Sequence, residues 1–303
     1  MSDRFTSART SRRSFLAELA ALGIGGGVLA ACARAGGSAG GASASVAAPS
    51  ANAIGLQLYT VRDRLQQDFE GTLEQVAQIG YTKVEFAGYY NRTPEQVRAL
   101  LDRLKLTAPS SHIGVNLLRQ DLAGQIAIAK TIGHEYVTAP SYPLPRGGGT
   151  LADWKNVVAE INKWGAACRD AGQRFAFHNH AGEFAPIEGR PGMDILLRDT
   201  DPSLVDFELD LYWARFANQD PAQLFERYPG RFAMWHVKDM RDPGGSKAMA
   251  PVGQGEIDFK AIFARARQSG LRHFFVEHDN AAQTGGSLES IRASHQHLRQ
   301  LLA

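Results

Sequence analysis

Short runs rich in Val, Ile, Phe and Tyr recur eight times between residues 54 and 303. Most of them lack charged residues until their C-terminal ends, as buried strands of a parallel sheet do. Stretches with helical periodicity separate these runs. We predict strands at 54–60, 83–87, 108–113, 136–140, 174–180, 205–211, 232–238 and 274–279.

The segments between the predicted strands carry helix signals. Residues 69–80 place apolar side chains at helical spacing. Thr93 precedes Pro94, a pair that favours a helix N-cap followed by its first turn. The segments 151–172 and 258–270 both close on a glycine, which is typical of a helix C-terminus.

Eight alternations of strand and helix imply an α/β protein with a parallel sheet. Residues 54–303 have the usual length of one closed (β/α)8 TIM barrel, which we therefore predict as the catalytic domain. The alternative is a doubly wound open sheet. No Gly-x-Gly-x-x-Gly follows the first strand, and this makes a dinucleotide-binding fold of that type less favoured.

Residues 1–31 have the composition of a signal peptide, with four arginines before an apolar, Gly/Ala-rich run. Within this stretch, residues 11–16 (Ser-Arg-Arg-Ser-Phe-Leu) resemble the twin-arginine export motif, so the export machinery of that pathway is a predicted partner. Residues 29–32 (Leu-Ala-Ala-Cys) resemble a lipobox, which implies lipidation at Cys32. The Ala/Gly/Ser-rich residues 32–53 predict a flexible tether. The expected product is a periplasmic or cell-envelope lipoprotein, attached to the membrane only through its lipid.

The formal charge of the whole chain is +2, and residues 1–31 hold four arginines against Asp3 and Glu18. The remainder is therefore close to neutral, which argues against nucleic acid as a partner. Only two cysteines are present. If Cys32 carries lipid, Cys168 has no disulfide partner, and we expect it in the core.

Ionisable residues gather at the C-terminal ends of the predicted strands, where the active sites of such barrels lie. Because alternate strand residues share a face, Asp206, Glu208 and Asp210 should point the same way, as should His236 with Lys238. Glu277 and Asp279 should also share one face of their strand, and His278 should point to the other face. Carboxylates and imidazoles without cysteine suit one divalent metal: Mn, Mg, Co or Zn.

Four motifs make a resemblance specific: Gln-Leu-Tyr-Thr-Val-Arg at 57–62, His-Asn-His-x-x-Glu-Phe at 178–184, Leu-Asp-x-x-Trp at 209–213 and His-x-Lys-Asp at 236–239. Together they resemble the xylose isomerase-like barrel superfamily, in its sugar phosphate isomerase/epimerase branch. The resemblance implies one divalent metal, with ligands from the predicted strands five to eight. These ligands are Glu183, Asp210, His236 and Glu277, with His180 as the alternative to Glu183. The alternative for Asp210 is a cap of the turn before Trp213, for His236 a hydrogen-bonded histidine of the barrel, and for Glu277 an ion pair with Lys238.

Further site residues follow from their places at the strand ends. We predict catalytic roles for Glu85, His112, His180 and Lys238, and substrate binding by Tyr59, His178 and Trp213. Glu85 and His112 have the alternative of supporting other site residues, and Lys238 that of neutralising carboxylates. Tyr59, Trp213 and Trp235 are candidate pocket walls, with core packing as the alternative for each. The glycine-containing loop 252–258 is predicted to lead into the next helix and to border the site.

These groups suit a metal-dependent isomerase or epimerase that forms an enediolate from a small carbohydrate, a sugar or keto-sugar. Because the same site can eliminate a β-substituent, a lyase, dehydratase or keto-glycoside-cleaving enzyme is an alternative. The export signal favours a substrate without phosphate. Two other hypotheses are a nuclease, since type IV AP endonucleases share this barrel, and a non-catalytic sugar-binding lipoprotein.

Overall fold

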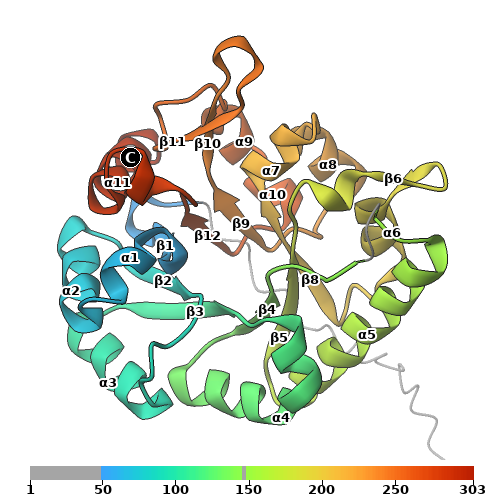
Figure 1. Ribbon diagram of the computed structural model, residues 1–303, viewed down its shortest axis with the longest axis horizontal. Coiled ribbons are helices and arrows are strands. Elements are labelled where there is room, and N and C mark those ends of the chain that lie inside the picture. Colours follow the sequence, from blue (N-terminus) through green and yellow to red (C-terminus); the bar gives the residue numbers. More distant parts are fainter. Residues whose placement is uncertain (1–48, 145–147) are drawn as a thin grey trace, which may run out of the picture. The chain divides into compact units, whose positions relative to one another are not determined.

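The computed structural model describes residues 49–144 and 148–303. Eight parallel strands follow one another around a closed barrel, and β1 pairs with both β2 and β12 (Figure 1). The predicted (β/α)8 barrel is therefore confirmed and the open sheet was wrong. The barrel strands are β1 Gly55–Gln57, β2 Lys83–Phe86, β3 Thr107–His112, β4 Tyr136–Ala139, β5 Arg174–His178, β8 Val205–Asp210, β9 Met234–Val237 and β12 His273–Val276.

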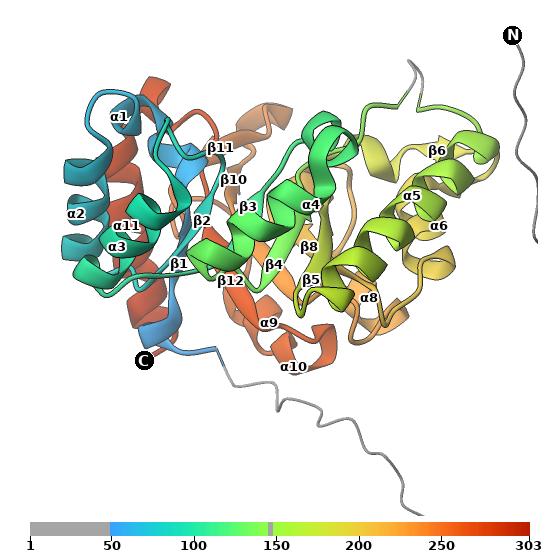
Figure 2. The ribbon, with the colours of Figure 1, turned by 90° about the horizontal axis from the view of Figure 1, so that it is seen from below.

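Helices lie outside the strands and cover the barrel wall (Figure 2). They are α1 Arg62–Leu65, α2 Phe69–Ile79, α3 Pro94–Leu104, α4 Val115–Ile132, α5 Leu151–Asp170, α6 Gly192–Asp199, α7 Leu211–Phe216, α8 Pro221–Arg227, α9 Phe259–Phe263, α10 Ala266–Ser269 and α11 Ser287–Leu301. Two small hairpins pair β6 Pro186–Ile187 with β7 Arg190–Pro191, and β10 Asp239–Arg241 with β11 Ala248–Ala250.

The predicted helix ends are observed, but one predicted helix is divided into two. Thr93 and Gln96 exchange side-chain and backbone hydrogen bonds in a capping box at the start of α3. Residues 258–270 form two short helices instead of one, α9 and α10, because the backbone at Arg265 leaves helical geometry (φ −102°, ψ 10°). Asp258 caps the first, and Gly270 ends the second at φ 89°.

All eight strands end before their predicted bounds, and the largest differences, three residues each, are in β1 and β12 at the mouth of the barrel. β1 stops at Gln57 because its side-chain Oε1 accepts the N–H of Tyr59 at 3.0 Å and so starts a 3-10 turn. β12 stops at Val276, and the N–H of His278 donates to Thr60 Oγ1 at 3.1 Å instead of to a neighbouring strand. Tyr59 and the residues after Val276 therefore project from irregular backbone.

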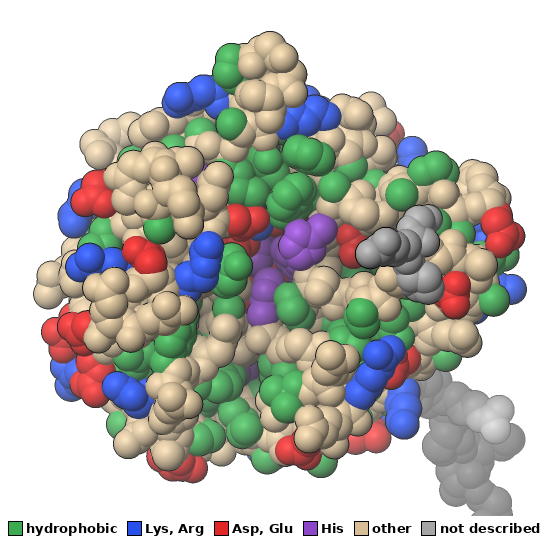
Figure 3. Space-filling model, viewed as in Figure 1, with side chains coloured by type: hydrophobic (Ala, Val, Ile, Leu, Met, Phe, Trp, Pro, Cys, Tyr) green, Lys and Arg blue, Asp and Glu red, His purple; other side chains and the backbone are tan. Residues whose placement is uncertain are grey.

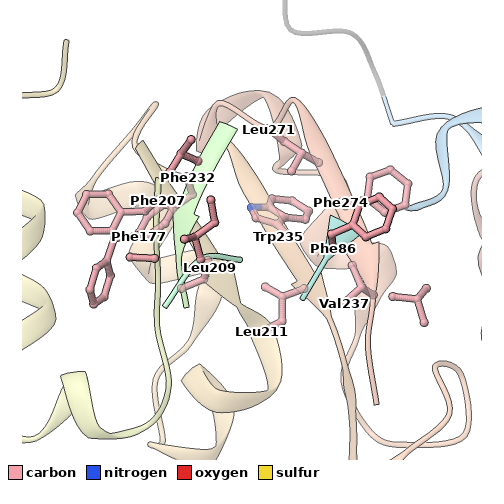
Figure 4. Close-up of a cluster of buried hydrophobic side chains, with 14 of the residues drawn as sticks. Phe86, Phe177, Phe207, Leu209, Leu211, Phe232, Trp235, Val237, Leu271 and Phe274 are labelled. Atoms are coloured by element: carbon pink, nitrogen blue, oxygen red, sulfur yellow. The ribbon is translucent and has the colours of Figure 1, made fainter. Parts of the chain in front are cut away.

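The outward faces of β5, β8 and β9 form a large part of the hydrophobic core (Figure 4). Phe177, Phe207 and Trp235 are fully buried there, and each such side chain contributes roughly 1.5–3 kcal/mol relative to exposure. Trp235 stacks on Phe225 of α8 with ring centroids 4.9 Å apart. Of its two predicted roles, pocket wall was therefore wrong and core residue is confirmed.

His134 is a buried imidazole beneath the β2–α3 loop. Its Nδ1 lies 2.6 Å from the carbonyl oxygen of Ala108, and its Nε2 lies 3.0 Å from the Tyr89 hydroxyl. Burial lowers the pKa of His134 to about 4, whereas the unfolded chain titrates near 6.5. Between these pH values the imidazole is protonated in the unfolded state and neutral in the folded state. The free energy of unfolding therefore falls as the pH drops through this window.

We expect wild-type protein to lose about 2 kcal/mol more unfolding free energy than His134→Gln when the pH falls from 7 to 5. Urea titrations at the two pH values measure this difference. His297→Gln on α11, a partly exposed position, is the control and should follow the wild type. Equal losses of unfolding free energy in wild type and His134→Gln would contradict the lowered pKa of His134.

Cys168 lies on α5 and is fully buried. Burial raises the pKa of its thiol to about 12, so the group stays protonated and is not a nucleophile at neutral pH. The prediction of a core cysteine is confirmed.

The predicted signal peptide, the lipidation site Cys32 and the predicted tether as far as residue 48 lie outside the described residues. At the end of that predicted tether, Ala51–Ala53 form a 3-10 turn, and the carbonyl of Asn52 accepts a hydrogen bond from Thr82 Oγ1 at 2.9 Å. Within residues 49–144 and 148–303, no helix combines the length and the apolar character needed to cross a bilayer.

Candidate metal and substrate site

Alternation along the strands places polar side chains at successive depths inside the barrel. On β8, Asp206 pairs with Arg174 near the N-terminal end at 2.5 Å, Glu208 lies midway, and Asp210 lies at the C-terminal end. The register sets Asp210 opposite His236 of β9. The predicted shared face of Asp206, Glu208 and Asp210 agrees with this arrangement, and the three side chains lie at different depths.

Four buried side chains meet where β5, β8, β9 and β12 end. Each offers one ligand atom, and these atoms lie within 4.8 Å of one another. Three of the atoms are buried and have close contacts to charged groups in place of well-formed hydrogen bonds: His178 Nε2, Asp210 Oδ2 and His236 Nδ1. His236 Nδ1 lies 2.7 Å from Glu277 Oε2, and His178 Nε2 lies 3.4 Å from Asp210 Oδ2. We call His178, Asp210, His236 and Glu277 the upper cluster.

Lys238 brings a positive charge to the upper cluster. Its Nζ lies 2.8 Å from Asp210 Oδ2, 2.8 Å from Glu277 Oε2 and 2.7 Å from Asp279 Oδ1. Burial by itself lowers the pKa of Lys238, but the three carboxylates outweigh it and raise that pKa well above its usual range. The ammonium group therefore stays charged and offsets the carboxylates, as the alternative role for Lys238 predicted.

A second group of ligand-type side chains lies deeper, on the other side of the His236 ring. We call Glu85, His112, Glu208 and His236 the lower cluster. His236 Nε2 lies 2.6 Å from Glu85 Oε2, and His112 Nε2 lies 2.7 Å from Glu208 Oε2. Glu85 also accepts hydrogen bonds from Gln57 and Ser110. It is fully buried behind His236, so the structure places it where it orients the ring and not where it would contact substrate.

The structure separates the candidates on β5 and the segment after it. His178, the last residue of β5, belongs to the upper cluster. Glu183 lies in the 3-10 turn Gly182–Phe184, where its Oε2 accepts the backbone N–H of His180 at 2.8 Å. Neither ligand cluster includes Glu183 or His180. Parity alone does not separate His178 from His180, because two residues apart on a strand they face the same way.

The upper cluster lies at the bottom of an open cavity of about 380 Å³. Histidines are visible within this hollow, with hydrophobic side chains around it (Figure 3). The residues that line it are Tyr59, Ala87, His112, Gly114, Pro140, His178, His180, Lys238, Glu277 and Asp279.

Most of the predicted catalytic and substrate-binding residues therefore line the cavity, and the exceptions are Glu85 and Trp213. Trp213 is not among its lining residues and packs behind the His180 ring, with centroids 5.6 Å apart. Asp279, which sequence analysis did not assign a role, does line it. Its shared parity with Glu277 was the signal that could have identified it.

The loop 252–258 folds around the carboxylate of Asp239, not into the cavity. That carboxylate accepts the backbone N–H groups of Gly253 and Gly255 at 2.8 and 2.9 Å, and those of Met240 and Ile257 at 2.8 and 3.2 Å. A Cβ on Gly255 would lie 2.2 Å from Asp239 Oδ1, so this position requires glycine. The loop leads into α9 as predicted, but it does not line the cavity.

Comparison with known proteins places this arrangement in a family. Residues 73–301 match the family described as "Xylose isomerase-like TIM barrel". The chain belongs to this family. That assignment agrees with the closed barrel and with the polar residues at the C-terminal ends of its strands.

Several individual proteins are similar to this chain. An inosose dehydratase from Geobacillus kaustophilus is 24% identical over 215 residues, which are 64% of this chain and 68% of the relative. A structure described as a sugar phosphate isomerase/epimerase from Parabacteroides distasonis is 26% identical with a TM-score of 0.70, covering 86% of this chain and 99% of its own. A xylose isomerase-like protein from Mycobacterium smegmatis, in complex with magnesium, is 16% identical with a TM-score of 0.63, over 84% of this chain and all of its own.

The residues of the upper cluster fit a divalent cation. Burying polar atoms without well-formed hydrogen bonds is costly, and three such atoms converge here beside the carboxylate of Glu277. His236 also has the environment of a metal-ligating histidine, because its second ring nitrogen contacts Glu85. Two imidazoles and two carboxylates form a donor set suited to several first-row divalent metals and to magnesium.

Proposed function

We propose that the chain is a metal-dependent isomerase or epimerase acting on an unphosphorylated sugar or keto-sugar. The observation that supports this most is the upper cluster at the bottom of an open, partly apolar cavity. His178, Asp210, His236 and Glu277 would hold the metal, with His178 in place of Glu183. A divalent metal bound there would supply Lewis-acid polarisation of a carbonyl group.

Residues of the cavity wall would handle the proton. The His180 ring lines the cavity, and its nitrogens make no hydrogen bond to the described residues. It is therefore free to take the proton from the carbon beside the carbonyl and to return it elsewhere. Returning it to the neighbouring carbon gives an isomer, and returning it to the other face gives an epimer.

Lys238 and His112 would position the substrate. The Lys238 ammonium lies in the cavity wall, where its positive charge, held in place by three carboxylates, can attract a substrate oxygen. His112 donates from Nε2 to Glu208, which fixes its ring in the wall. Burial raises the pKa of Glu208, but His236 and His112 outweigh it and lower that pKa, so Glu208 is ionised and accepts this bond.

A dehydratase is the second candidate, and the inosose dehydratase relatives favour it. Elimination begins with the same proton removal but ends with loss of a hydroxyl from the next carbon. Incubation of metal-loaded protein with sugars, inososes and keto-glycosides in D₂O, followed by NMR, tests both. Deuterium in a recovered isomer or epimer supports the first candidate, and an unsaturated or deoxy product supports the second. No exchange with any substrate class would contradict the proposed proton chemistry and favour a sugar-binding role.

We further propose that the protein works outside the inner membrane. This rests on residues 1–32, with their twin-arginine and lipobox motifs. Sugar phosphates are scarce there, whereas free sugars and glycosides are available. A fusion of residues 1–52 to a reporter that is active only after export should be active, and replacing Arg12 and Arg13 by lysine should abolish that activity. A reporter that remains cytoplasmic would contradict this proposal.

We expect a free sugar to be turned over with a higher kcat/KM than its phosphate ester. Among the lining residues of the cavity, Lys238 is the only Lys or Arg, and three carboxylates already surround it. A dianion would therefore meet little uncompensated positive charge. Matched pairs of sugar and ester, measured with the same metal, check this. A much higher kcat/KM for the ester would contradict it.

A further inference from the structure

A second, shallow pocket of about 270 Å³ adjoins the central cavity. It is lined by Tyr59, Arg62, Gln66, Ala87, Gly88 and Tyr90. Tyr59 and Ala87 line both spaces, so a ligand can extend from one to the other past these two residues. The cavity alone is near the lower end of the roughly 300–1,000 Å³ typical of ligand pockets, so a ligand with two rings needs both spaces.

The boundary between the two spaces is an exposed aromatic ring. Tyr59 is 42% exposed, one of three large hydrophobic residues so exposed in the described part of the chain. The guanidinium of Arg62 lies 3.9 Å from the centroid of this ring, and its Nη1 donates to the Tyr59 carbonyl at 2.8 Å. An aromatic surface next to a fixed guanidinium and the amide of Gln66 offers both apolar contact and hydrogen-bond donors.

The far wall of the shallow pocket is held in a strained conformation. Tyr90 and Asn91 are consecutive non-glycine residues with left-handed backbone, at φ 50° and 60°. The loop is fixed beneath by Tyr89, whose hydroxyl donates to Ser111 Oγ at 3.1 Å and contacts His134. Such strain costs roughly 1–3 kcal/mol per residue and is concentrated at binding sites, where it keeps a surface in one shape. The pocket is thus preformed.

We propose that the shallow pocket is a subsite for the second sugar unit of a glycoside, whose carbonyl-bearing unit occupies the central cavity. Arg62 is the only charged residue among its lining residues, and the others offer amide, hydroxyl and aromatic groups. This is the chemistry that recognises a neutral, hydroxyl-rich ring. The inference rests on the proposed function and narrows its substrate class from free sugars to glycosides.

Binding of ketose disaccharides tests the subsite without requiring turnover. The probes are lactulose, isomaltulose and turanose, with D-fructose as their common ketose unit, titrated calorimetrically into the metal-loaded full chain. We expect at least one disaccharide to bind about tenfold more tightly than D-fructose. The double variant Arg62→Ala/Gln66→Ala should lose this advantage and keep its affinity for D-fructose. Saturation-transfer NMR should show contacts to the non-ketose unit in wild type and not in the variant.

Arg64→Ala/Gln67→Ala is the matched control, because both residues are exposed near the pocket without lining it. It should behave as wild type, and circular dichroism and metal content should be unchanged in both double variants. Equal affinities for D-fructose and all three disaccharides in wild type would overturn the subsite. So would an advantage that survives in Arg62→Ala/Gln66→Ala. Absence of binding by every probe, together with absence of exchange in D₂O, would instead overturn the proposed function and the subsite with it.

Discussion

We expect Asp210→Asn to lose bound metal and, with it, measurable turnover. Losing the hydrogen-bond partner of a ligand typically costs about 10–100-fold in metal affinity, and losing an ionised ligand costs more. The substitution should leave the fold intact, because Asp210 Oδ1 accepts the N–H of Trp213 at 2.9 Å and an amide oxygen can take over that bond. Elemental analysis of the purified chain, together with circular dichroism, measures both effects.

The matched pair His178→Gln and Glu183→Gln decides whether the last residue of β5 or the turn after it supplies a metal ligand. His178→Gln should reduce metal content, because His178 Nε2 belongs to the upper cluster. Glu183→Gln should retain the metal, since its amide oxygen can still accept the N–H of His180. The reverse outcome would restore Glu183 as the ligand. Full occupancy in Asp210→Asn and His178→Gln alike would refute the upper cluster as the metal site.

We expect His180→Gln to lower turnover by about two to four decades, the usual contribution of an acid–base group, with the metal retained. The reason is its place in the cavity wall, outside both ligand clusters. Exchange of the substrate proton in D₂O should fall by the same factor as turnover, because both require its removal.

Glu85→Gln distinguishes this direct role from support of a neighbour. Glu85 contacts His236 and does not line the cavity, so its variant should weaken metal binding and turnover together, and added metal should restore part of the turnover. Metal should not restore His180→Gln. A His180→Gln variant with unchanged turnover would remove His180 from the mechanism.

The barrel was predictable because each strand and helix carries its own local pattern. Thr93, Asp258 and Gly270 mark helix ends through hydrogen bonds made within a few residues. The early end of β1 was not predictable, because it depends on the Gln57 side chain turning back to its own backbone. The break at Arg265 has no comparable marker in the sequence.

The sequence predicted which side chains point into the barrel, but not how deep inside it each of them lies. Parity placed Asp210 on the inner face, as the structure does. Parity could not show that Glu208 belongs to the lower cluster, or that Glu85 lies behind His236, since depth follows from the register of several strands. The placement of Glu183 also escaped prediction, because a 3-10 turn directs its carboxylate to a backbone N–H.

The pairing of β1 with β12 has a consequence for timing during synthesis. A ribosome adds roughly 5–20 residues per second, so Glu277 is made about 3–13 s after Asp210. Until then β1 lacks one neighbour, and the nascent chain offers at most three residues of the upper cluster. If the upper cluster holds the metal as proposed, high-affinity capture would have to wait until the last strand joins the first. The metal acquired would then be set by what is available in the compartment where the finished chain folds, and not by what the growing chain meets.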